Sequence, residues 1–460
     1  MDVTHWYIGL ALVFGLYMAW NIGANDVANA MGTSVGSGAL TLRRAVIIAA
    51  VMEFCGAFFV GPHVSETVRQ GIVDLNIVGE DPELLLLGML AALLAAGGWL
   101  QLASYFGWPV STTHSIVGAI VGFGLVQGGP DAVQWGKLGS IVASWVVSPA
   151  LAGLVAFVIF RLVLTGIFYK PDPVAAAKKA TPWIAGLVIV VMMLVLAFKG
   201  LKPFWKTMGF DNPQTGTPLA IGLGGAVVLG LLATAVGKYM VQRIGDADPV
   251  SADHARNIYL VRALSKAIMH LRRVRNTSVG ATRDEADRVL QDTQAIYRTL
   301  DQQTTRDGAS NAFLKVERIF IVLQVISAAF VAFAHGANDV ANAIGPMSVV
   351  VEIANSKPMA VPKEATVGTI MLMVGGVGIV AGLAMWGWRV MQTVGRRITE
   401  LTPSRGFCAE FAAALTILIA SVYKLPISTT HTLVGAVLGV GMARGIGALN
   451  LNTVRDIAVS

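Results

Sequence analysis

Long apolar stretches recur from one end of this chain to the other, and they leave it few ways to fold. Most are close to the roughly 20 residues that cross a bilayer as a helix, whereas 115–126 and 432–448 are short or unusually flanked. Because lipid offers no hydrogen bonds, a chain in a bilayer must satisfy its own backbone, which predicts helices throughout. We therefore expect an all-α polytopic membrane protein with 10–12 transmembrane segments, built on apolar segments at 6–20, 45–61, 84–106, 115–126, 137–164, 183–198, 218–237, 317–334, 368–388, 407–423 and 432–448.

The charge content agrees with this class of protein. Only 13% of the residues are charged and 55% are hydrophobic, whereas a soluble protein carries about a quarter charged residues. The net charge of +7 does not indicate a nucleic acid partner, because Lys and Arg gather in loops, as topology rules predict for cytoplasmic loops. Cys55 and Cys408 lie in apolar segments, which argues against disulfides and thiolate metal sites. The sequence predicts a multi-pass protein of the plasma or inner membrane, surrounded by lipid and without a cofactor.

One segment departs from this pattern. Residues 238–315 are polar, mix both charge signs and carry apolar residues such as Leu290 and Ile296 at roughly helical spacing. Their excess of Lys and Arg predicts a cytoplasmic helical insertion, which is either a linker and packing module or a regulatory element. The predicted domains are a first membrane repeat at 1–165, additional transmembrane helices at 166–237, the insertion at 238–315 and a second membrane repeat at 316–460.

Two motifs occur twice in the chain. GANDVANA stands at 23–30 and again at 336–343. PVSTTHSIVGAIVGFG at 109–124 is matched by PISTTHTLVGAVLGVG at 426–441, and the interval between copies is nearly the same for both motifs. Two separate motifs kept in one order at nearly one spacing indicate duplication of a large structural unit, an arrangement common in transporters.

Charged residues near the motifs indicate that the two copies lie in opposite orientations. Arg43 and Arg44 follow the first GANDVANA, whereas residues 74–83 are acidic. In the second copy, the arginines come only after the following apolar span, at Arg389, Arg396 and Arg397. If cationic loops face the cytoplasm, the copies form an inverted-topology repeat. Transporters of this kind place the substrate at the repeat interface near the bilayer midplane.

GANDVANA puts an acid and two amides where an apolar helix would otherwise continue. A charged side chain in hydrocarbon costs at least about 2.5–3.5 kcal/mol, so each aspartate calls for a partner. Flanking glycines permit a broken helix whose carbonyls line a cavity. The resulting oxygen cluster suits an alkali or alkaline-earth cation, and the alternative is that these residues are interhelical hydrogen-bonding groups. The predicted cation-binding residues are Asn25, Asp26 and Asn29 in the first copy and Asn338, Asp339 and Asn342 in the second.

Each P-x-S-T-T-H stretch predicts the start of a half-length helix. Proline favours helix starts, and Ser and Thr are preferred N-caps. A helix N-terminus is an anion site, because it presents unpaired N–H groups and the positive end of the helix dipole. Two re-entrant half-helices that meet from opposite sides would enclose a tetrahedral oxyanion; the alternative is an ordinary capped helix in each copy. The predicted anion-binding residues are Ser111, Thr112, Thr113, Ser428, Thr429 and Thr430.

Other polar residues stand within the apolar segments. Glu53 and Glu410 are functional candidates, because a carboxylate inside a membrane is costly, although packing is the alternative. His114 and His431 either contact substrate, pass protons or are structural. His335 precedes the second GANDVANA and has no histidine counterpart in the first copy, so it is not included in the predicted site.

These paired motifs resemble those of the PiT family of inorganic phosphate transporters, over the whole membrane part of the chain. The resemblance implies an inverted repeat with broken helices and re-entrant segments, usually dimeric, that moves inorganic phosphate together with a cation. The family's cation and anion motif residues map onto the twelve Asn, Asp, Ser and Thr residues named above. Its two essential glutamates look like Glu53 and Glu410. The expected partners are therefore phosphate, a cation and a second copy of the chain.

The resemblance also favours one coupling ion. Some bacterial members of the family have His-Asp in the first motif and are proton-coupled, whereas this chain has Asn-Asp in both copies, like the sodium-coupled members. We expect a secondary active transporter that imports phosphate by symport with Na⁺, with H⁺ as the alternative ion and sulfate as the alternative substrate. An intramembrane hydrolase is a weaker alternative, because hydrolysis does not need a duplicated, symmetric site. A passive channel is a further weak alternative.

Overall fold

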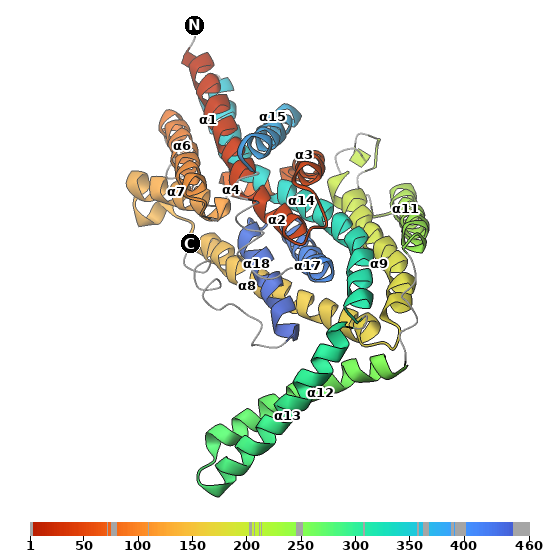
Figure 1. The fold of residues 1–460 in the computed structure, drawn as a ribbon. Coiled ribbons are helices and arrows are strands. Elements are labelled where there is room, and N and C mark those ends of the chain that lie inside the picture. Colours follow the sequence, from red (N-terminus) through yellow and green to blue (C-terminus); the bar gives the residue numbers. More distant parts are fainter. Residues whose placement is uncertain are drawn as a thin grey trace. The chain divides into compact units, whose positions relative to one another are not determined.

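The computed structural model confirms that the chain is almost entirely helical (Figure 1). The structure describes residues 3–70, 72–74, 81–108, 110–201, 205–206, 208–210, 212, 214–244, 252–306, 309–356, 358–361, 368–387, 391 and 402–444. Arg389, Arg396 and Arg397, which helped to orient the second repeat, lie outside these residues, as does the side chain of Asn29.

The chain forms two compact units. The larger comprises Met1–Arg161, Ile184–Thr234 and Ile321–Ser460, and the smaller comprises Leu162–Trp183 and Ala235–Phe320. The helices of the described residues are α1 (Val3–Asn25), α2 (Val27–Gly36), α3 (Leu42–Phe59), α4 (Pro62–Gln70), α6 (Pro82–Phe106), α7 (Thr112–Gly128), η1 (Pro130–Ala132), α8 (Trp135–Val163), η2 (Leu164–Phe168), α9 (Pro173–Val195), η3 (Leu196–Gly200), α11 (Gly216–Gln242), α12 (Ala252–Thr277), α13 (Ala281–Arg306), α14 (Ala309–Asn355), α15 (Thr369–Gly382), η4 (Leu383–Gly387), α17 (Pro403–Val422) and α18 (Thr429–Arg444).

Each of the eleven predicted apolar segments coincides with one of these helices. Among the described residues, eight helices are long and apolar enough to cross a membrane. The other three segments form α3, α7 and α18, which have 18, 17 and 16 residues. At about 1.5 Å per residue, a helix as short as α7 or α18 falls short of the roughly 30 Å hydrocarbon core.

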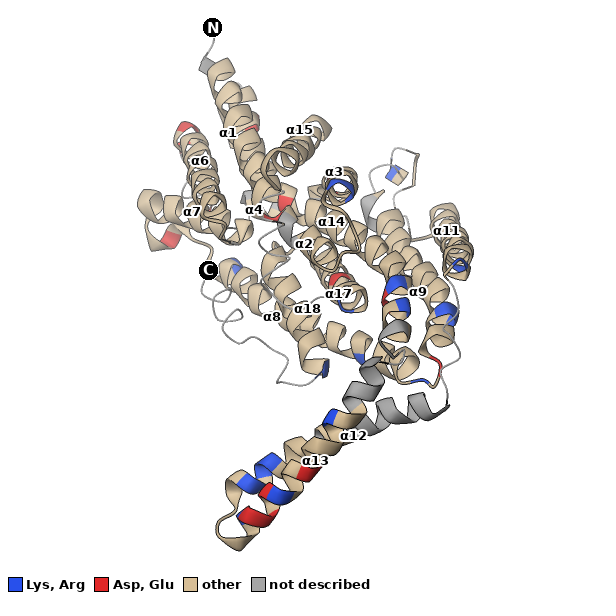
Figure 2. Ribbon diagram, in the orientation of Figure 1, with Lys and Arg blue, Asp and Glu red and all other residues tan. Residues whose placement is uncertain are grey.

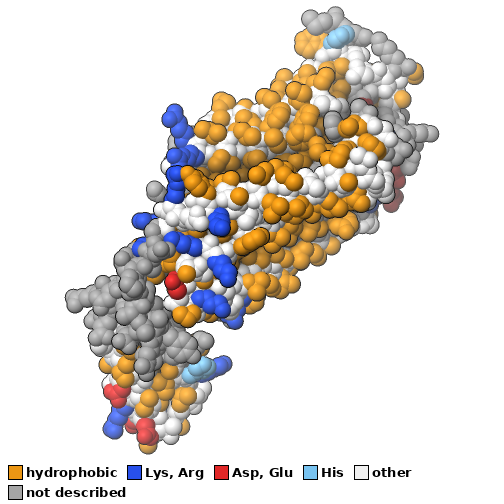
Figure 3. Space-filling view, turned by 90° about the vertical axis from the view of Figure 1, so that its right-hand side faces the viewer, with side chains coloured by type: hydrophobic (Ala, Val, Ile, Leu, Met, Phe, Trp, Pro, Cys, Tyr) orange, Lys and Arg blue, Asp and Glu red, His pale blue; other side chains and the backbone are white. Residues whose placement is uncertain are grey.

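Apolar side chains cover much of the outside of the larger unit. In α11 only 17% of the most apolar 18-residue stretch is buried, and the side chains of Val228, Leu231 and Leu232 are more than half exposed. Figure 3 shows a broad field of hydrophobic side chains on one face of the molecule. Monomeric soluble proteins rarely expose apolar patches of this extent, so the chain is a multi-pass membrane protein whose outer side chains face lipid.

The first glycine of each GANDVANA lets two helices touch. A Cβ added at Gly23 of α1 would lie 1.9 Å from the carbonyl oxygen of Ile379 in α15. A Cβ at Gly336 of α14 would lie 2.2 Å from the carbonyl oxygen of Glu53 in α3. Equivalent positions of the two repeats therefore make equivalent backbone contacts. Small residues of this kind allow close helix packing in membranes.

The two copies of GANDVANA differ in their backbone. In the first copy, Asp26 separates α1 from α2, and its N–H still bonds the carbonyl of Ile22 at 2.9 Å. The second copy lies inside α14, which continues from Ala309 to Asn355. The interruption is therefore slight in the first copy, and the second copy is an unbroken helix.

In the smaller unit, α12 and α13 form a helical pair, as expected for the polar insertion. Figure 2 shows residues of both charge signs along these helices. Ala286 and Leu290 of α13 are buried, whereas Val289 and Ile296 are exposed. Helix α13 thus buries the apolar side chains on one of its faces and exposes those on another.

Candidate functional site

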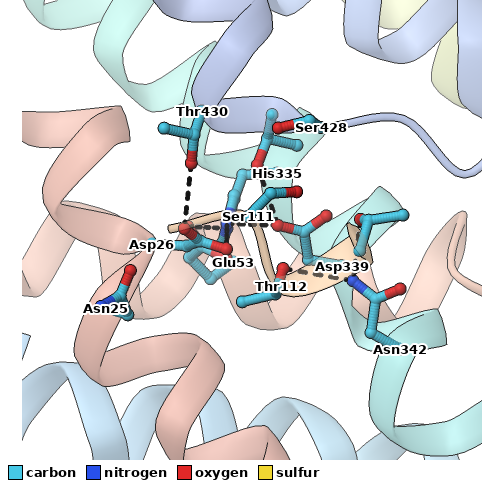
Figure 4. Close-up of polar contacts among 12 residues, drawn as sticks. Asn25, Asp26, Glu53, Ser111, Thr112, His335, Asp339, Asn342, Ser428 and Thr430 are labelled. Carbon is cyan, nitrogen blue, oxygen red and sulfur yellow. Dashed lines mark hydrogen bonds and ion pairs between the residues drawn. The ribbon is translucent and has the colours of Figure 1, made fainter. Parts of the chain in front are cut away.

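Two aspartates that hold the same place in the two copies of GANDVANA meet at one buried histidine. Asp339 Oδ2 lies 2.7 Å from His335 Nε2, and Asp26 Oδ2 lies 4.0 Å from the same nitrogen. Both aspartates are fully buried, and the histidine is 1% exposed. Figure 4 shows the three side chains directed toward one another between the two GANDVANA segments. These three residues are also placed closely enough to share a metal ion.

His335 was not among the residues predicted from the sequence. Its Nδ1 lies 2.8 Å and 2.7 Å from the two carboxylate oxygens of Glu53, opposite the nitrogen that faces Asp339. An imidazole can donate to both sides only when both nitrogens carry a proton. A weak signal was available: His335 and Asp339 are four residues apart, so they share one face of a helix.

The Ser/Thr motifs start helices, as predicted. Ser111 caps α7, because its Oγ accepts from the N–H of His114 at 3.3 Å. Ser428 does the same for α18, accepting from the N–H of His431 at 3.2 Å. Each cap is followed by two threonines in the first turn, so hydroxyl groups surround the positive end of each helix dipole.

The threonines join the anion motifs to the aspartate motifs. Thr429 Oγ1 donates to Asp339 Oδ2 at 2.9 Å, and Thr430 Oγ1 donates to Asp26 Oδ1 at 3.1 Å. Consecutive residues of α18 thus contact the aspartates of different repeats (Figure 4). Hydrogen bonds to charged groups contribute about 1.5–3 kcal/mol, so these contacts offset part of the burial cost of the carboxylates.

The first repeat contributes through α7. The side-chain amide of Asn342 donates to Thr112 Oγ1 at 3.3 Å and to Thr113 Oγ1 at 3.1 Å. Thr113 Oγ1 in turn donates to the carbonyl of Ile427, just before α18, at 3.0 Å. The N-termini of α7 and α18 therefore lie next to each other.

The first asparagine of each motif lies at the edge of the site. Asn25 donates to Ser104 Oγ at 2.9 Å, and the amide of Asn338 lies 3.2 Å from Ser421 Oγ. Ser104 and Ser421 stand at matching positions ahead of the two anion motifs, so the two contacts are repeat-equivalent. They tie each GANDVANA segment to the helix that precedes an anion motif.

The two glutamates lie in different surroundings. Glu53 reaches the aspartates through His335. Glu410 of α17 is buried in a separate polar cluster, where it accepts hydrogen bonds from Thr33 at 2.5 Å, Ser34 at 2.6 Å, Ser327 at 2.6 Å and Gln324 at 3.2 Å. Both glutamates were predicted as functional candidates from the sequence. In the structure, Glu53 belongs to the cluster around the aspartates and Glu410 lies in a different one.

A many-helix membrane fold, a duplicated motif pair and a buried polar centre where the copies meet define a membrane transporter. The chain belongs to the phosphate transporter family, whose model matches residues 22–460. This confirms the resemblance drawn from the motifs, and the chain is a transporter rather than an enzyme.

Individual relatives cover nearly the whole chain. A protein of Chlamydia pneumoniae named as a phosphate permease is 44% identical over 98% of this chain and 92% of the relative. The chloroplastic inorganic phosphate transporter 2-1 of Arabidopsis thaliana is 44% identical over 98% of this chain and 68% of the relative. A solved structure described as the sodium-dependent phosphate transporter matches with a TM-score of 0.72 and 36% identity, covering 98% of this chain and 94% of the other.

Proposed function

We propose that the chain imports inorganic phosphate by symport with a cation, with sodium favoured and the proton as the alternative. The sodium assignment is supported by a solved relative that is described as sodium-dependent. It is also supported by the Asn-Asp pair in both motif copies. In this proposal the phosphate-binding residues are Ser111, Thr112, Thr113, Ser428, Thr429 and Thr430, and the cation ligands come from Asn25, Asp26, Asn29, Asn338, Asp339 and Asn342.

One observation carries the proposal. Thr429 and Thr430 belong to the predicted anion site, yet their hydroxyls donate to Asp339 and Asp26 of the predicted cation site. The two sites therefore share hydrogen bonds, and a ligand at one must change the groups offered at the other. Sites joined in this way are coupled, and the coupling is reciprocal.

The charges near the aspartates explain why a cation would be needed. Among the residues that the structure describes, Asp26, Asp339 and Glu53 face one cationic candidate, His335. Phosphate adds about one to two negative charges near neutral pH, and each helix N-terminus supplies only about half a positive charge. In a low-dielectric setting this sum is repulsive. Cations held by the aspartates would remove the repulsion and raise the affinity for phosphate.

The hydroxyl contacts suggest how the ion acts. A cation on Asp26 or Asp339 would occupy carboxylate oxygens that now accept from Thr430 and Thr429. The freed hydroxyls would turn toward the anion at the N-termini of α7 and α18. Phosphate would then bind with its charge balanced, and the inverted repeats would move against each other to expose the site on the other side. Glu53 would act through His335, and a homodimer is part of the proposal.

Reconstitution in liposomes tests this proposal. We expect radiolabelled phosphate to accumulate when an inward sodium gradient is imposed, and to accumulate less under a pH gradient alone. Greater accumulation under the pH gradient than under the sodium gradient would identify the proton, and not sodium, as the coupling ion. Unlabelled phosphate should compete better than sulfate; stronger competition by sulfate would overturn the substrate assignment. Uptake that follows neither gradient would contradict symport.

A further inference from the structure

Each anion motif ends in a histidine that the proposed function does not use. His114 is the third residue of α7, and His431 is the third residue of α18. The two histidines hold the same place in their motif copies, and their rings lie with centroids 4.9 Å apart and planes at 69°. The meeting of the two helix ends therefore creates a histidine pair that neither repeat has alone.

Trp145 of α8 fixes this pair from one side. Its ring packs on His114 with centroids 3.9 Å apart. Its indole N–H donates to the carbonyl of Pro426 at 3.1 Å, in the segment that leads into α18. One tryptophan thus holds the imidazole of the first repeat and the backbone next to the second. The His114 ring is therefore held in place next to His431, which favours binding of a ligand that joins the two rings.

His114 has a nitrogen that lacks a partner. Its Nε2 is buried and has no hydrogen-bond partner among the described residues. A buried polar atom without a partner is costly, and neutral imidazole carries one nitrogen lone pair. Next to it lies a cavity of about 390 Å³, whose polar lining comes from Ser111, His114 and Ser115 and whose described lining includes no carboxylate. This cavity reaches His114 but not His431, so it can supply water to an ion held between the two rings.

The donor atoms select the kind of ion. Imidazole suits borderline cations such as Zn²⁺, Ni²⁺ and Cu²⁺, whereas Na⁺ and Mg²⁺ prefer oxygen. With Zn–N bonds of about 2.0–2.1 Å, two imidazoles on one tetrahedral zinc have ring centroids roughly 5 Å apart. The observed separation of 4.9 Å agrees with this spacing. Water in the cavity would complete the coordination.

We propose that His114 and His431 form a transition-metal site that bridges the first turns of α7 and α18. Zinc is its simplest occupant. A metal held there ties together the two helix ends that carry Ser111 and Ser428, so it inhibits any movement that separates them. The predicted inhibition of uptake rests on the proposed function, phosphate transport. The predicted binding of metal does not depend on it.

Metal binding is tested on the purified full-length protein after removal of metal with a chelator. Zinc titration by calorimetry should show a binding step that His114→Gln and His431→Gln each weaken at least tenfold. His270→Ala, at an exposed histidine of α12, is the matched control and should leave the affinity unchanged. Equal zinc affinity in the wild type and both glutamine variants would overturn the proposal.

A spectroscopic measurement guards against variants that bind poorly because they misfold. Electron paramagnetic resonance of bound Cu²⁺ should report two imidazole nitrogens in the wild type and one in either variant. A single nitrogen in the wild type would also overturn the site. In liposomes, zinc should slow phosphate uptake by the wild type but not by His114→Gln, each compared with its own zinc-free rate. Absence of any uptake would refute the transport proposal and leave the binding result standing.

Discussion

At the scale of single residues, each of the twin aspartates is fully buried and accepts a hydrogen bond from a neighbouring hydroxyl. Asp26 accepts from Thr430 of the other repeat, whereas Asp339 accepts from Thr429 of its own repeat. Replacing either charge removes a proposed cation ligand but leaves a side chain of nearly the same size. The fold should therefore survive substitutions that abolish coupling.

Asp26→Asn and Asp339→Asn should each lower sodium-driven phosphate uptake at least about tenfold, because the loss of one charged contact is worth about 1.5–3 kcal/mol. The measurement is the initial uptake rate in liposomes, with size-exclusion chromatography as the check on folding. Asp292→Asn, at an exposed position of α13, is the control. Full transport by both site variants would refute the cation assignment.

The threonines should control phosphate affinity. Thr429→Val and Thr430→Val keep the side-chain shape but remove the hydroxyls that reach the aspartates, so the KM for phosphate should rise about tenfold. Thr416→Val is matched to them, because Thr416 is also buried and its hydroxyl donates to the carbonyl of Ala412 in its own helix. A KM unchanged from that of the wild type in the double variant would count against the anion site.

His335 shows where prediction from sequence stopped. Comparison of the two motif copies points to residues that occur twice. His335 does not, because Ile22 stands at the equivalent position of the first copy. The packing glycines extend this comparison, because Gly336 meets Glu53 where Gly23 meets Ile379. The His335–Glu53 pair thus has two isoleucines as its counterpart. A functional residue that is present in only one repeat cannot be found by looking for residues that the two copies share.

Among the helices, local signals were the most reliable. The helix starts at Ser111 and Ser428 were predictable because capping depends on adjacent residues. The helix break at the second GANDVANA was expected and is absent, since α14 continues through it. The reason is physical: Asp339 is satisfied by Thr429 and His335, so the chain does not need to free its own carbonyls there. Contacts from distant helices decided this, and no local pattern encodes them.

The packing glycines can be tested directly. Gly23→Ala and Gly336→Ala should destabilise the protein by about 1–3 kcal/mol, because the new methyl group meets a backbone carbonyl that cannot rotate away. Gly9→Ala, in the same helix as Gly23, meets nothing within 4 Å and should be neutral or slightly stabilising. Thermal unfolding of the detergent-purified variants measures the difference. Equal melting temperatures for all three would contradict the packing role.

For the whole molecule, the apolar segments predicted the helices because lipid allows little else. The opposite orientation of the repeats remains a prediction, because it depends on loop charges. It predicts that Ala39, after α2, and Asn355, at the end of α14, lie on opposite sides of the membrane, with Ala39 in the cytoplasm.

Cysteine labelling measures this orientation. Ala39→Cys and Asn355→Cys, each in a background without Cys55 and Cys408, are exposed to an impermeant maleimide in intact cells. Only the Asn355 variant should react before the membrane is opened. Labelling of both from the same side would contradict an inverted repeat.

The central claim is that ions on the twin aspartates create the phosphate site, and phosphate binding with and without sodium tests it most directly. Calorimetry on the purified protein should show sodium lowering the Kd for phosphate at least about tenfold, by the roughly 1.4 kcal/mol or more expected of coupled sites. In the double variant Asp26→Asn with Asp339→Asn, this effect of sodium should vanish. The same sodium effect in the double variant would contradict the claim.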